Sequence, residues 1–244
     1  MLKEIFLMMF GAFVTVSANA RGEFEMDTIT TSEGDLKIQF IGHGSLIFTF
    51  DKKVIHIDPY GMLADYSKLP KADIILITHD HPDHFDLQAI AMIQTKDTVV
   101  ILTKACAERL AGGIVMGNRD SRVVQGLQIE AVPAYNIVHK RDNGQPFHPP
   151  GAGNGYIMTC GDKRVYVAGD TENIPAMKAL QRIDIAFLPM NLPYTMTPEM
   201  VAEAAQVFKS KILYPYHYGD TDTAKVVAAL KAVKGIEVCI RNMK

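Results

Sequence analysis

Short apolar runs recur along the chain from residue 36 onward, and most have the length of a β-strand. Residues 36–40, 45–50 and 54–57 follow one another closely and predict an antiparallel meander. The continuous apolar run 74–77 predicts a strand that is covered on both faces. Further strands are predicted at 99–102, 129–132, 156–159, 165–168, 185–188 and 212–214, with Gly161 and Asp162 in a hairpin turn.

Helical stretches alternate with these strands. The pattern predicts helices over residues 84–93, 104–111, 198–208 and 221–233, with Thr197 as an N-cap before Pro198. Asp220 and Thr221 are both candidates for the cap of the last helix. Residues 139–155 contain four Gly and three Pro and predict a long loop, which is often a functional feature of compact domains. The order of elements, with no linker after residue 36, predicts one α/β domain with sheet packed on sheet and helices outside.

The first 20 residues have the pattern of a secretion signal. Lys3 precedes an apolar run over residues 5–16, and Ala18-Asn19-Ala20 supplies the small-x-small motif of a signal peptidase site. The run is shorter than the roughly 20 residues that span a bilayer. We therefore predict a cleaved signal peptide over residues 1–20 and a periplasmic or secreted protein without a stable membrane span. An uncleaved anchor or a buried helix is the alternative.

Residues 21–35 are polar and are predicted to form a flexible lead-in, so the folded domain would comprise residues 36–244. The chain has 244 residues, a hydrophobic fraction of 48% and a formal net charge of −2. No long run of Lys and Arg is present, so nucleic acid is not expected as a partner. The three cysteines, Cys106, Cys160 and Cys239, are too widely spaced for a disulfide framework or a zinc ribbon. Two interpretations stay open for them: one disulfide bridge, or buried free thiols.

The segment with the strongest chemical character is Thr-His-Asp-His-Pro-Asp-His, which starts at residue 78 directly after the predicted strand 74–77. Alternate side chains of an extended stretch share a face, so His79 and His81 can reach one point. Asp83 and His84 would project to a neighbouring point once the chain turns into the next helix. Imidazole and carboxylate are the usual ligands of zinc-like ions. Such a cluster is costly to desolvate without a shared cation and predicts a metal site rather than a polar surface turn.

Two other strands end in residues of the same kind. Asp170 follows the predicted strand 165–168, and Gly169 before it allows a tight turn. His217 lies just past the predicted strand 212–214. Because Asp also caps helices, a capping role for Asp170 stays open at this stage.

Taken in order, these motifs resemble the metallo-β-lactamase superfamily. The resemblance rests on Ile57-Asp58-Pro59, the histidine-rich motif at 78–84, a later histidine, Ala168-Gly169-Asp170-Thr171 and Pro215-Tyr216-His217-Tyr218-Gly219. A closer resemblance, to small metal-dependent hydrolases that include ascorbate-6-phosphate lactonase-like proteins, rests on Gly42-His43-Gly44-Ser45, Pro133-Ala134-Tyr135-Asn136 and Phe147-His148-Pro149. It implies an αββα sandwich for residues 36–244, with the metal site at the edge of the two sheets.

The resemblance also implies a set of ligands for two divalent cations. Carried over by position, the metal-binding residues would be His79, His81, Asp83, His84, His148, Asp170 and His217. The first cation would take His79, His81 and a third histidine, the second would take Asp83, His84 and His217, and Asp170 would bridge both. His148 and His139 both lie in the long loop; we favour His148, because its spacing to Tyr156 and Asp170 fits the family. Asp58 would orient the histidine-rich motif.

The implied activity is that of a metal-dependent hydrolase in which a hydroxide activated by two metals attacks an ester, lactone or phosphodiester bond of a small molecule. Asp83 and Asp170 would be its catalytic carboxylates. Zinc is the first expectation for a His-rich site, with manganese or iron as alternatives. A secreted β-lactamase is one alternative function, against which Asp170 argues, because lactamases lack a bridging carboxylate. A metal-binding protein without catalysis is another.

Four further residues lie in loops beside the motifs and are candidates for the substrate pocket, with capping, packing or turn roles as alternatives: His43, Tyr60, Asn136 and Tyr194. Neither the substrate nor the oligomeric state follows from the sequence.

Overall fold

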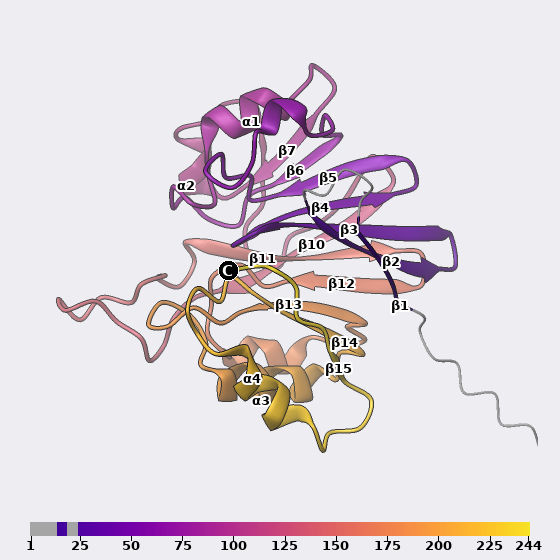
Figure 1. Cartoon of the computed structure of the whole chain (residues 1–244). Helices are drawn as coiled ribbons and strands as arrows, with labels where there is room; N and C mark the ends of the chain where they lie inside the picture. The colour runs from indigo at the N-terminus through magenta and orange to yellow at the C-terminus, as the bar shows by residue number, and fades with distance from the viewer. Residues whose placement is uncertain (1–13, 19–23) are drawn as a thin grey trace, which may run out of the picture.

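The computed structural model describes residues 14–18 and 24–244. Its strands form two sheets that pack face to face, with helices on the outer face of each (Figure 1). The αββα sandwich expected from the motifs is therefore confirmed. The predicted signal peptide lies outside the described residues, except for residues 14–18, which form an edge strand. No helix in the described part of the chain is long and apolar enough to cross a membrane.

The first sheet runs in sequence order. Its strands are β1 (Val14–Ala18), β2 (Glu25–Thr31), β3 (Gly34–Gly42), β4 (Ser45–Phe50), β5 (Lys53–Ile57), β6 (Ile74–Leu76), β7 (Val99–Leu102) and β8 (Ile114–Val115). The strands pair antiparallel from β1 to β5 and parallel from β5 to β8. Helices α1 (Leu87–Ile93) and α2 (Lys104–Ala107) follow β6 and β7 and cover its outer face.

In the second sheet, too, strands that are consecutive in the sequence are neighbours. Its strands are β15 (Glu237–Val238), β14 (Ile212–Tyr216), β13 (Ile185–Pro189), β12 (Lys163–Val167), β11 (Gly153–Cys160), β10 (Leu127–Ala134) and β9 (Ser121–Val124). Strands β12 to β15 are parallel, and β9 to β12 are antiparallel. Helices α3 (Pro198–Phe208) and α4 (Thr223–Leu230) pack on its outer face.

The main core lies between the two sheets. On β6, Ile74 and Leu76 face this core, whereas Ile75 faces the helices α1 and α2. A strand that is buried on both faces reads as a continuous apolar run, which explains why the pattern predicted it correctly. The predicted turn at Gly161 and Asp162 and the helix that starts at Pro198 with Thr197 as its cap are also confirmed.

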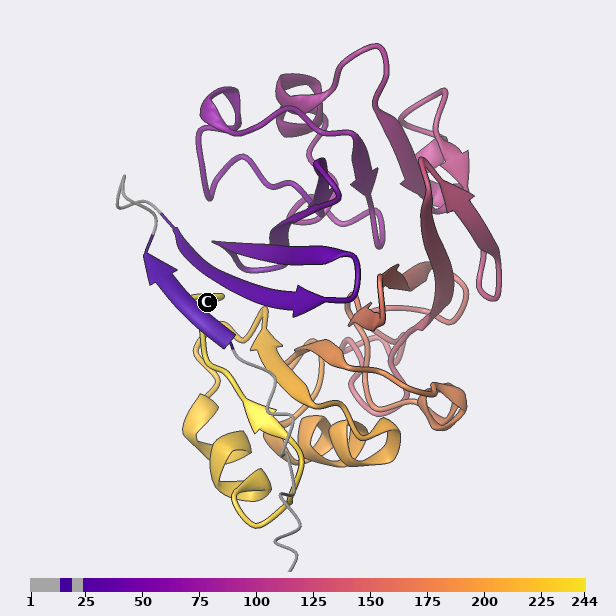
Figure 2. The same ribbon diagram turned by 90° about the vertical axis from the view of Figure 1, so that its right-hand side faces the viewer.

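The expectation of a flexible lead-in over residues 21–35 is wrong for its described part. Strand β2 pairs with β3 and buries Asp27, Ile29 and Thr31 on one face. Tyr214 donates its hydroxyl proton to Asp27 over 2.5 Å, and Arg241 donates three guanidinium hydrogen bonds to the same carboxylate, one from Nε and two from Nη2. The C-terminal segment lies beside β2, where the Asn242 N–H bonds the Glu25 carboxylate at 2.6 Å (Figure 2). A buried carboxylate is stable only with such partners. Because Asp27 occupies a core position, residues 25–31 lack the apolar pattern that would have predicted a strand.

Helix boundaries differ from the predicted ones where a side chain caps the backbone. Helix α1 starts at Leu87 rather than at His84, because Asp86 accepts hydrogen bonds from the N–H groups of Gln88 and Ala89 at 2.8 and 3.2 Å. Helix α4 starts at Thr223, two residues later than predicted, because Asp222 caps it rather than Asp220 or Thr221. Helix α2 has a single turn rather than the predicted span 104–111. The three cysteines are buried free thiols.

Candidate metal centre

The site lies where parallel strands of both sheets end. Asp58 follows β5, His79 follows β6, Asp170 follows β12 and His217 follows β14. The carboxyl ends of neighbouring parallel strands meet at one edge of a sheet, so these residues converge although they are far apart in the chain. The backbone N–H of Asn154 donates to the Thr78 carbonyl over 2.8 Å and joins the two sheets at this edge.

Asp58 contacts two residues of the histidine-rich motif, Thr78 and His84, and fixes their positions. Its carboxylate accepts the Thr78 N–H at 2.8 Å and the Thr78 hydroxyl at 2.6 Å, and it lies 2.8 Å from Nδ1 of His84. Asp58 itself is fully buried. A carboxylate on one ring nitrogen fixes the orientation of an imidazole and leaves the other nitrogen for a cation, so this contact directs His84 Nε2 into the site.

One group of possible ligands consists of His79, His81 and His148, whose ligand atoms lie within 4.8 Å of one another. His148 comes from the loop before β11. Asn136 Oδ1 accepts hydrogen bonds from the His148 backbone N–H at 3.0 Å and from Nδ1 at 2.6 Å, which leaves Nε2 facing the group. With Asp170, these histidines line a small, partly open cavity of about 20 Å³, large enough for one water molecule or ion.

A second group consists of Asp83, His84, His217 and His43, also within 4.8 Å. Asp83 and His84 lie in the turn before α1 rather than in a helix, since the N–H of His84 bonds the His81 carbonyl at 3.0 Å. His43 lies in the turn between β3 and β4. Its Nε2 is 2.9 Å from Asp83 Oδ2, and its ring centroid is 3.6 Å from that of His217. The pocket candidate His43 therefore belongs to the cluster itself.

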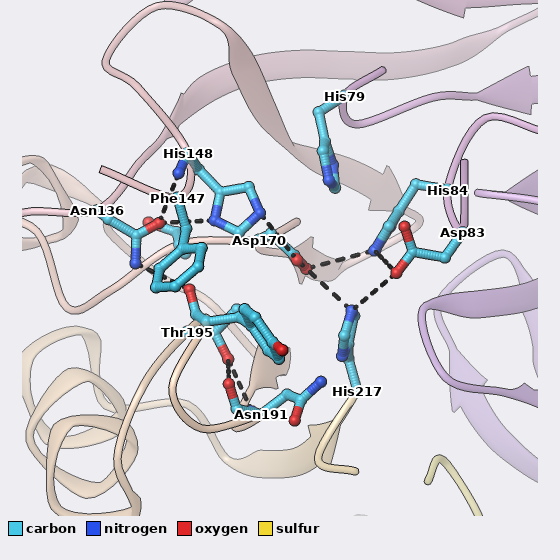
Figure 3. A network of polar contacts seen from close by, with 12 residues as sticks. His79, Asp83, His84, Asn136, Phe147, His148, Asp170, Asn191, Thr195 and His217 are labelled. Atoms are coloured by element: carbon cyan, nitrogen blue, oxygen red, sulfur yellow. Dashed lines mark hydrogen bonds and ion pairs between the residues drawn. The ribbon is translucent and has the colours of Figure 1, made fainter. Parts of the chain in front are cut away.

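Asp170 lies between the two groups (Figure 3). Its Oδ2 is 3.2 Å from His148 Nε2 and 3.5 Å from His217 Nε2, and its Oδ1 is 3.5 Å from His84 Nε2. The turn that places Asp170 here requires glycine at residue 169. Gly169 has a φ of +64°, and a Cβ there would meet the Asn154 carbonyl oxygen at 2.8 Å. One carboxylate thus contacts histidines of both groups, which goes beyond the role of a simple turn residue.

The cluster contains buried polar atoms that form no hydrogen bond with any group in the described residues. They are Nε2 of His79, Nε2 of His84, both ring nitrogens of His217 and Oδ1 of Asp170. Burying polar atoms without partners is unfavourable, and native proteins rarely do so. One nitrogen of each of these histidines and the carboxylate of Asp170 lie close together and form the donor set that divalent transition metals bind. The residues present therefore fit a metal centre.

The protonation of the metal-free cluster reflects the same crowding. Burial lowers the pKa of His79 well below its usual value and that of His217 to about 4. Burial acts in the same direction on His84, but Asp170 and Asp58 outweigh it and raise the pKa of His84 to about 9. For Asp170, burial acts to raise the pKa, yet His217 and His84 hold it well below the usual range. Cations that bind here would replace protons, so binding should weaken at low pH.

A pocket of about 440 Å³ opens onto the cluster. It is lined by His81, Pro82, Asp83, Arg141, Phe147, His148, Asp170, Asn191, Tyr194 and His217. Of the sequence-predicted pocket residues only Tyr194 lines it. Asn136 is buried behind His148, and the Tyr60 ring lies 6.2 Å from that of His43. The sequence did not identify Arg141, Phe147 and Asn191 as pocket residues, because nothing in their local pattern marks them.

Glu172 is a further residue that sequence reasoning missed. It is buried, and its carboxylate accepts the backbone N–H groups of Ile137 and Val138 at 2.7 Å and of His139 at 2.6 Å. It also accepts a hydrogen bond from the Asn136 amide at 3.2 Å. Nδ1 of His139 lies 2.9 Å from Glu172, and His139 belongs to none of the groups of possible metal ligands among the described residues. Of the two loop histidines, the structure therefore brings His148 and not His139 to the other candidate ligands.

Comparisons with known proteins agree with this geometry. The family model described as "Beta-lactamase superfamily domain" matches residues 37–217. A protein of Parabacteroides distasonis described as a metal-dependent hydrolase is 49% identical, with a TM-score of 0.86 over 91% of this chain and 100% of that chain. A UPF0173 metal-dependent hydrolase of Pelotomaculum thermopropionicum is 29% identical over 84% of this chain and 96% of its own length. A metallo hydrolase of Ignicoccus hospitalis, 24% identical over 84% of this chain and 94% of its own, shares the fold with a TM-score of 0.70.

Proposed function

The chain belongs to the metallo-β-lactamase superfamily and is a metal-dependent hydrolase, and from this premise we propose that it cleaves an ester, lactone or phosphodiester bond of a small molecule with two divalent cations. The observation that carries the proposal is the position of Asp170. Its two oxygens lie 3.2 Å from His148 and 3.5 Å from His84, which belong to different ligand groups. A carboxylate in that position suits a bridge between two cations.

In this proposal the two ligand groups hold one cation each. His79, His81 and His148 would hold the first, Asp83, His84 and His217 would hold the second, and Asp170 would serve both. Zinc is the cation we propose, because imidazole predominates among these ligands; manganese or iron would suit the carboxylates. Asp58 contacts Nδ1 of His84, and Asn136 accepts from Nδ1 of His148. In each ring Nε2 stays available to a cation, which supports the role of Asp58 and Asn136 in orienting these ligands.

Two divalent cations at this site would supply Lewis acidity, which brings the pKa of a water molecule toward neutrality and polarises the bond to be cleaved. The side chain of Asp83 is 37% exposed and lines the pocket, so it can accept a proton from a nucleophile there. Burial acts to raise the pKa of Asp83, but the hydrogen bond from His43 and the charges of His84 and His217 lower it below the usual value. His43 also holds the carboxylate in place. Tyr194 and Asn191 would position the substrate.

The first experiment counts metals and screens substrate classes on the same preparation. Elemental analysis of protein from metal-replete medium should give close to two transition-metal ions per chain. A panel with a phosphodiester, a lactone, a thioester and a β-lactam should then show turnover of the phosphodiester or the lactone that is lost with the metal. Turnover of the β-lactam alone would favour the β-lactamase alternative. A metal content near zero in folded protein would refute the metal centre.

A variant pair tests the bridging role. Asp170→Ala should lose metal and most of the turnover while it keeps its fold, because the strand β12 before it is anchored by buried Val165 and Val167. Asp162→Ala is the matched control, since Asp162 lies in the exposed β11–β12 turn and contacts Ser32 and Lys163. A lower melting temperature of Asp170→Ala with unchanged metal content and turnover would instead assign it a capping role, with an effect of about 0.5–2 kcal/mol.

We also propose that residues 1–20 are removed on export and that the mature enzyme, residues 21–244, acts in the periplasm or outside the cell. The support is the Ala18-Asn19-Ala20 motif after an apolar segment. Cleavage after Ala20 would remove β1 and make β2 the edge strand of the first sheet, still paired with β3.

A further inference from the structure

The loop that supplies His148 is a built hairpin rather than an irregular connection. Lys140 and Pro146 form an antiparallel bridge, and the Arg141 backbone N–H bonds the Gln145 carbonyl at 2.8 Å. The N–H of Gly144 closes the tip on the Arg141 carbonyl, also at 2.8 Å. In Figure 1 this segment projects from the sandwich between β10 and β11. Its side chains therefore have defined positions relative to the metal centre.

Both ends of the hairpin are fixed to buried groups of the site. At its start, Glu172 holds the backbone of residues 137–139 through three hydrogen bonds. At its end, Asn136 bonds the backbone and ring of His148. The hairpin is thus anchored at the same residues that orient a candidate metal ligand, and its rim faces the pocket that opens onto the cluster.

Arg141 is held at the outer wall of that pocket. Its guanidinium lies 5.2 Å from the centre of the Phe147 ring and donates to the Phe147 carbonyl at 3.3 Å. Phe147 in turn packs edge-on against Tyr194, with ring centroids 5.0 Å apart. Stacking on an aromatic ring reduces the freedom of a long side chain, so the remaining guanidinium N–H groups are available in a limited range of orientations.

Arg141 is an exposed residue whose guanidinium can meet an anionic group of a molecule bound in the pocket. Arg141 is the one Lys or Arg among the residues that line the pocket, and in the described part of the chain it forms no ion pair. Asp83 and Asp170 lie at the inner end, where the bound cations would neutralise them. A second hollow of about 380 Å³, lined by Arg141, Asp142, Asn143 and Phe147, adjoins the outer end. A bound molecule would therefore meet positive charge at both ends of the pocket.

We propose that Arg141 binds an oxyanion group of the substrate, a carboxylate or a phosphate, at the outer end of the pocket. The substrate is then an organic anion whose hydrolysable bond lies at the His–Asp cluster, while its second charged group lies against the guanidinium. The planar fork of Arg matches the two oxygens of such a group. This inference rests on the proposed function, because it assumes that the cluster is the hydrolytic centre.

The test measures binding rather than turnover, so it does not depend on the panel assay. Malonate, succinate, glutarate and adipate are titrated into the metal-loaded protein by calorimetry, each against the monocarboxylate of equal chain length. The wild type should bind one dicarboxylate about tenfold more tightly than its partner, as expected for one charge-assisted contact at a partly exposed site. The chain length that binds best reports the separation of the two ends.

Variants assign the effect to Arg141. Arg141→Met should abolish the preference for the dicarboxylate, and Arg141→Lys should retain part of it. Arg122→Met is the matched control, because Arg122 is exposed on β9 and does not line the pocket. Comparing 3-phosphonopropionate with succinate shows which oxyanion loses more affinity in Arg141→Met, and a loss for either supports the proposal.

Three results would overturn it. The wild type could show no preference at any chain length, Arg141→Met could keep the preference, or Arg122→Met could lose it equally, which would indicate a general charge effect. Failure of the proposed function looks different, because then no panel substrate is hydrolysed whatever the dicarboxylates do.

Discussion

Asn136 offers a direct test of how the second layer of residues controls the metal centre. Its side chain is 3% exposed and forms four hydrogen bonds. Oδ1 accepts from the backbone and the ring of His148 at 3.0 and 2.6 Å, and Nδ2 donates to Glu172 at 3.2 Å and to the Tyr194 carbonyl at 2.9 Å. Asn136→Ala removes all four at once. The ring of His148 then loses its hydrogen-bond acceptor. In the wild type this acceptor keeps the proton on Nδ1, so that Nε2 is free for a cation.

The magnitudes follow from these contacts. Loss of a hydrogen bond that orients a metal-binding histidine lowers metal affinity about 10–100-fold, which is about 1.4–2.8 kcal/mol. The effect should fall on the cation held by His79, His81 and His148, and leave the other nearly unchanged. The free energy of unfolding of the metal-free protein should also fall. At about 1 kcal/mol for each hydrogen bond, the upper limit for four is about 4 kcal/mol, less where water enters.

The assay separates the two effects. Metal affinity is measured by competition with a chelator at a temperature where the metal-free variant is folded, and stability is measured by urea unfolding of the metal-free protein. Asn173→Ala is the matched control, since Asn173 donates a similar 2.9 Å hydrogen bond to Glu203 at an exposed position. If Asn136→Ala loses stability but binds both cations as tightly as the wild type, the orienting role is wrong and Asn136 only fastens the loop.

Three further predictions address the ligands, the pH dependence and the N-terminus. His148→Ala should lose about one metal ion per chain by elemental analysis and His139→Ala none, because His139 faces Glu172; the opposite pattern would reverse the assignment. Burial lowers the pKa of His56 to about 4, so between pH 6.5 and 4 the unfolded state binds a proton that the folded state does not, and stability falls as the pH drops. At pH 5 this amounts to about 2 kcal/mol relative to pH 7, and urea unfolding of metal-free His56→Gln should show a smaller fall; equal falls would contradict it. N-terminal sequencing of protein from its native host should give a start near Arg21, whereas an intact Met1 would argue against a cleaved signal.

The sequence by itself determined the parts of the site that rest on local patterns. His79 and His81 follow an apolar strand at alternate positions, and extended backbone puts alternate side chains on one face, so their convergence needs no distant information. The continuous run at 74–77 indicated a strand covered on both faces for the same local reason. Thr197 and Pro198 marked the start of α3 because capping involves only neighbours in the chain. Together these patterns predicted the layered fold and the strand ends at which the candidate ligands lie.

Only the tertiary structure decided the features that depend on contacts between distant segments. His139 and His148 occupy the same loop, and Glu172 and Asn136 determine which of them faces the cluster. Strand β2 contains a buried Asp27 because Arg241, 214 residues away, neutralises it. His43 joins Asp83 across 40 residues, and Arg141 lines the pocket because Phe147 holds it there. Such contacts leave no periodic trace in the sequence, since they arise only when the two sheets and their loops have packed together.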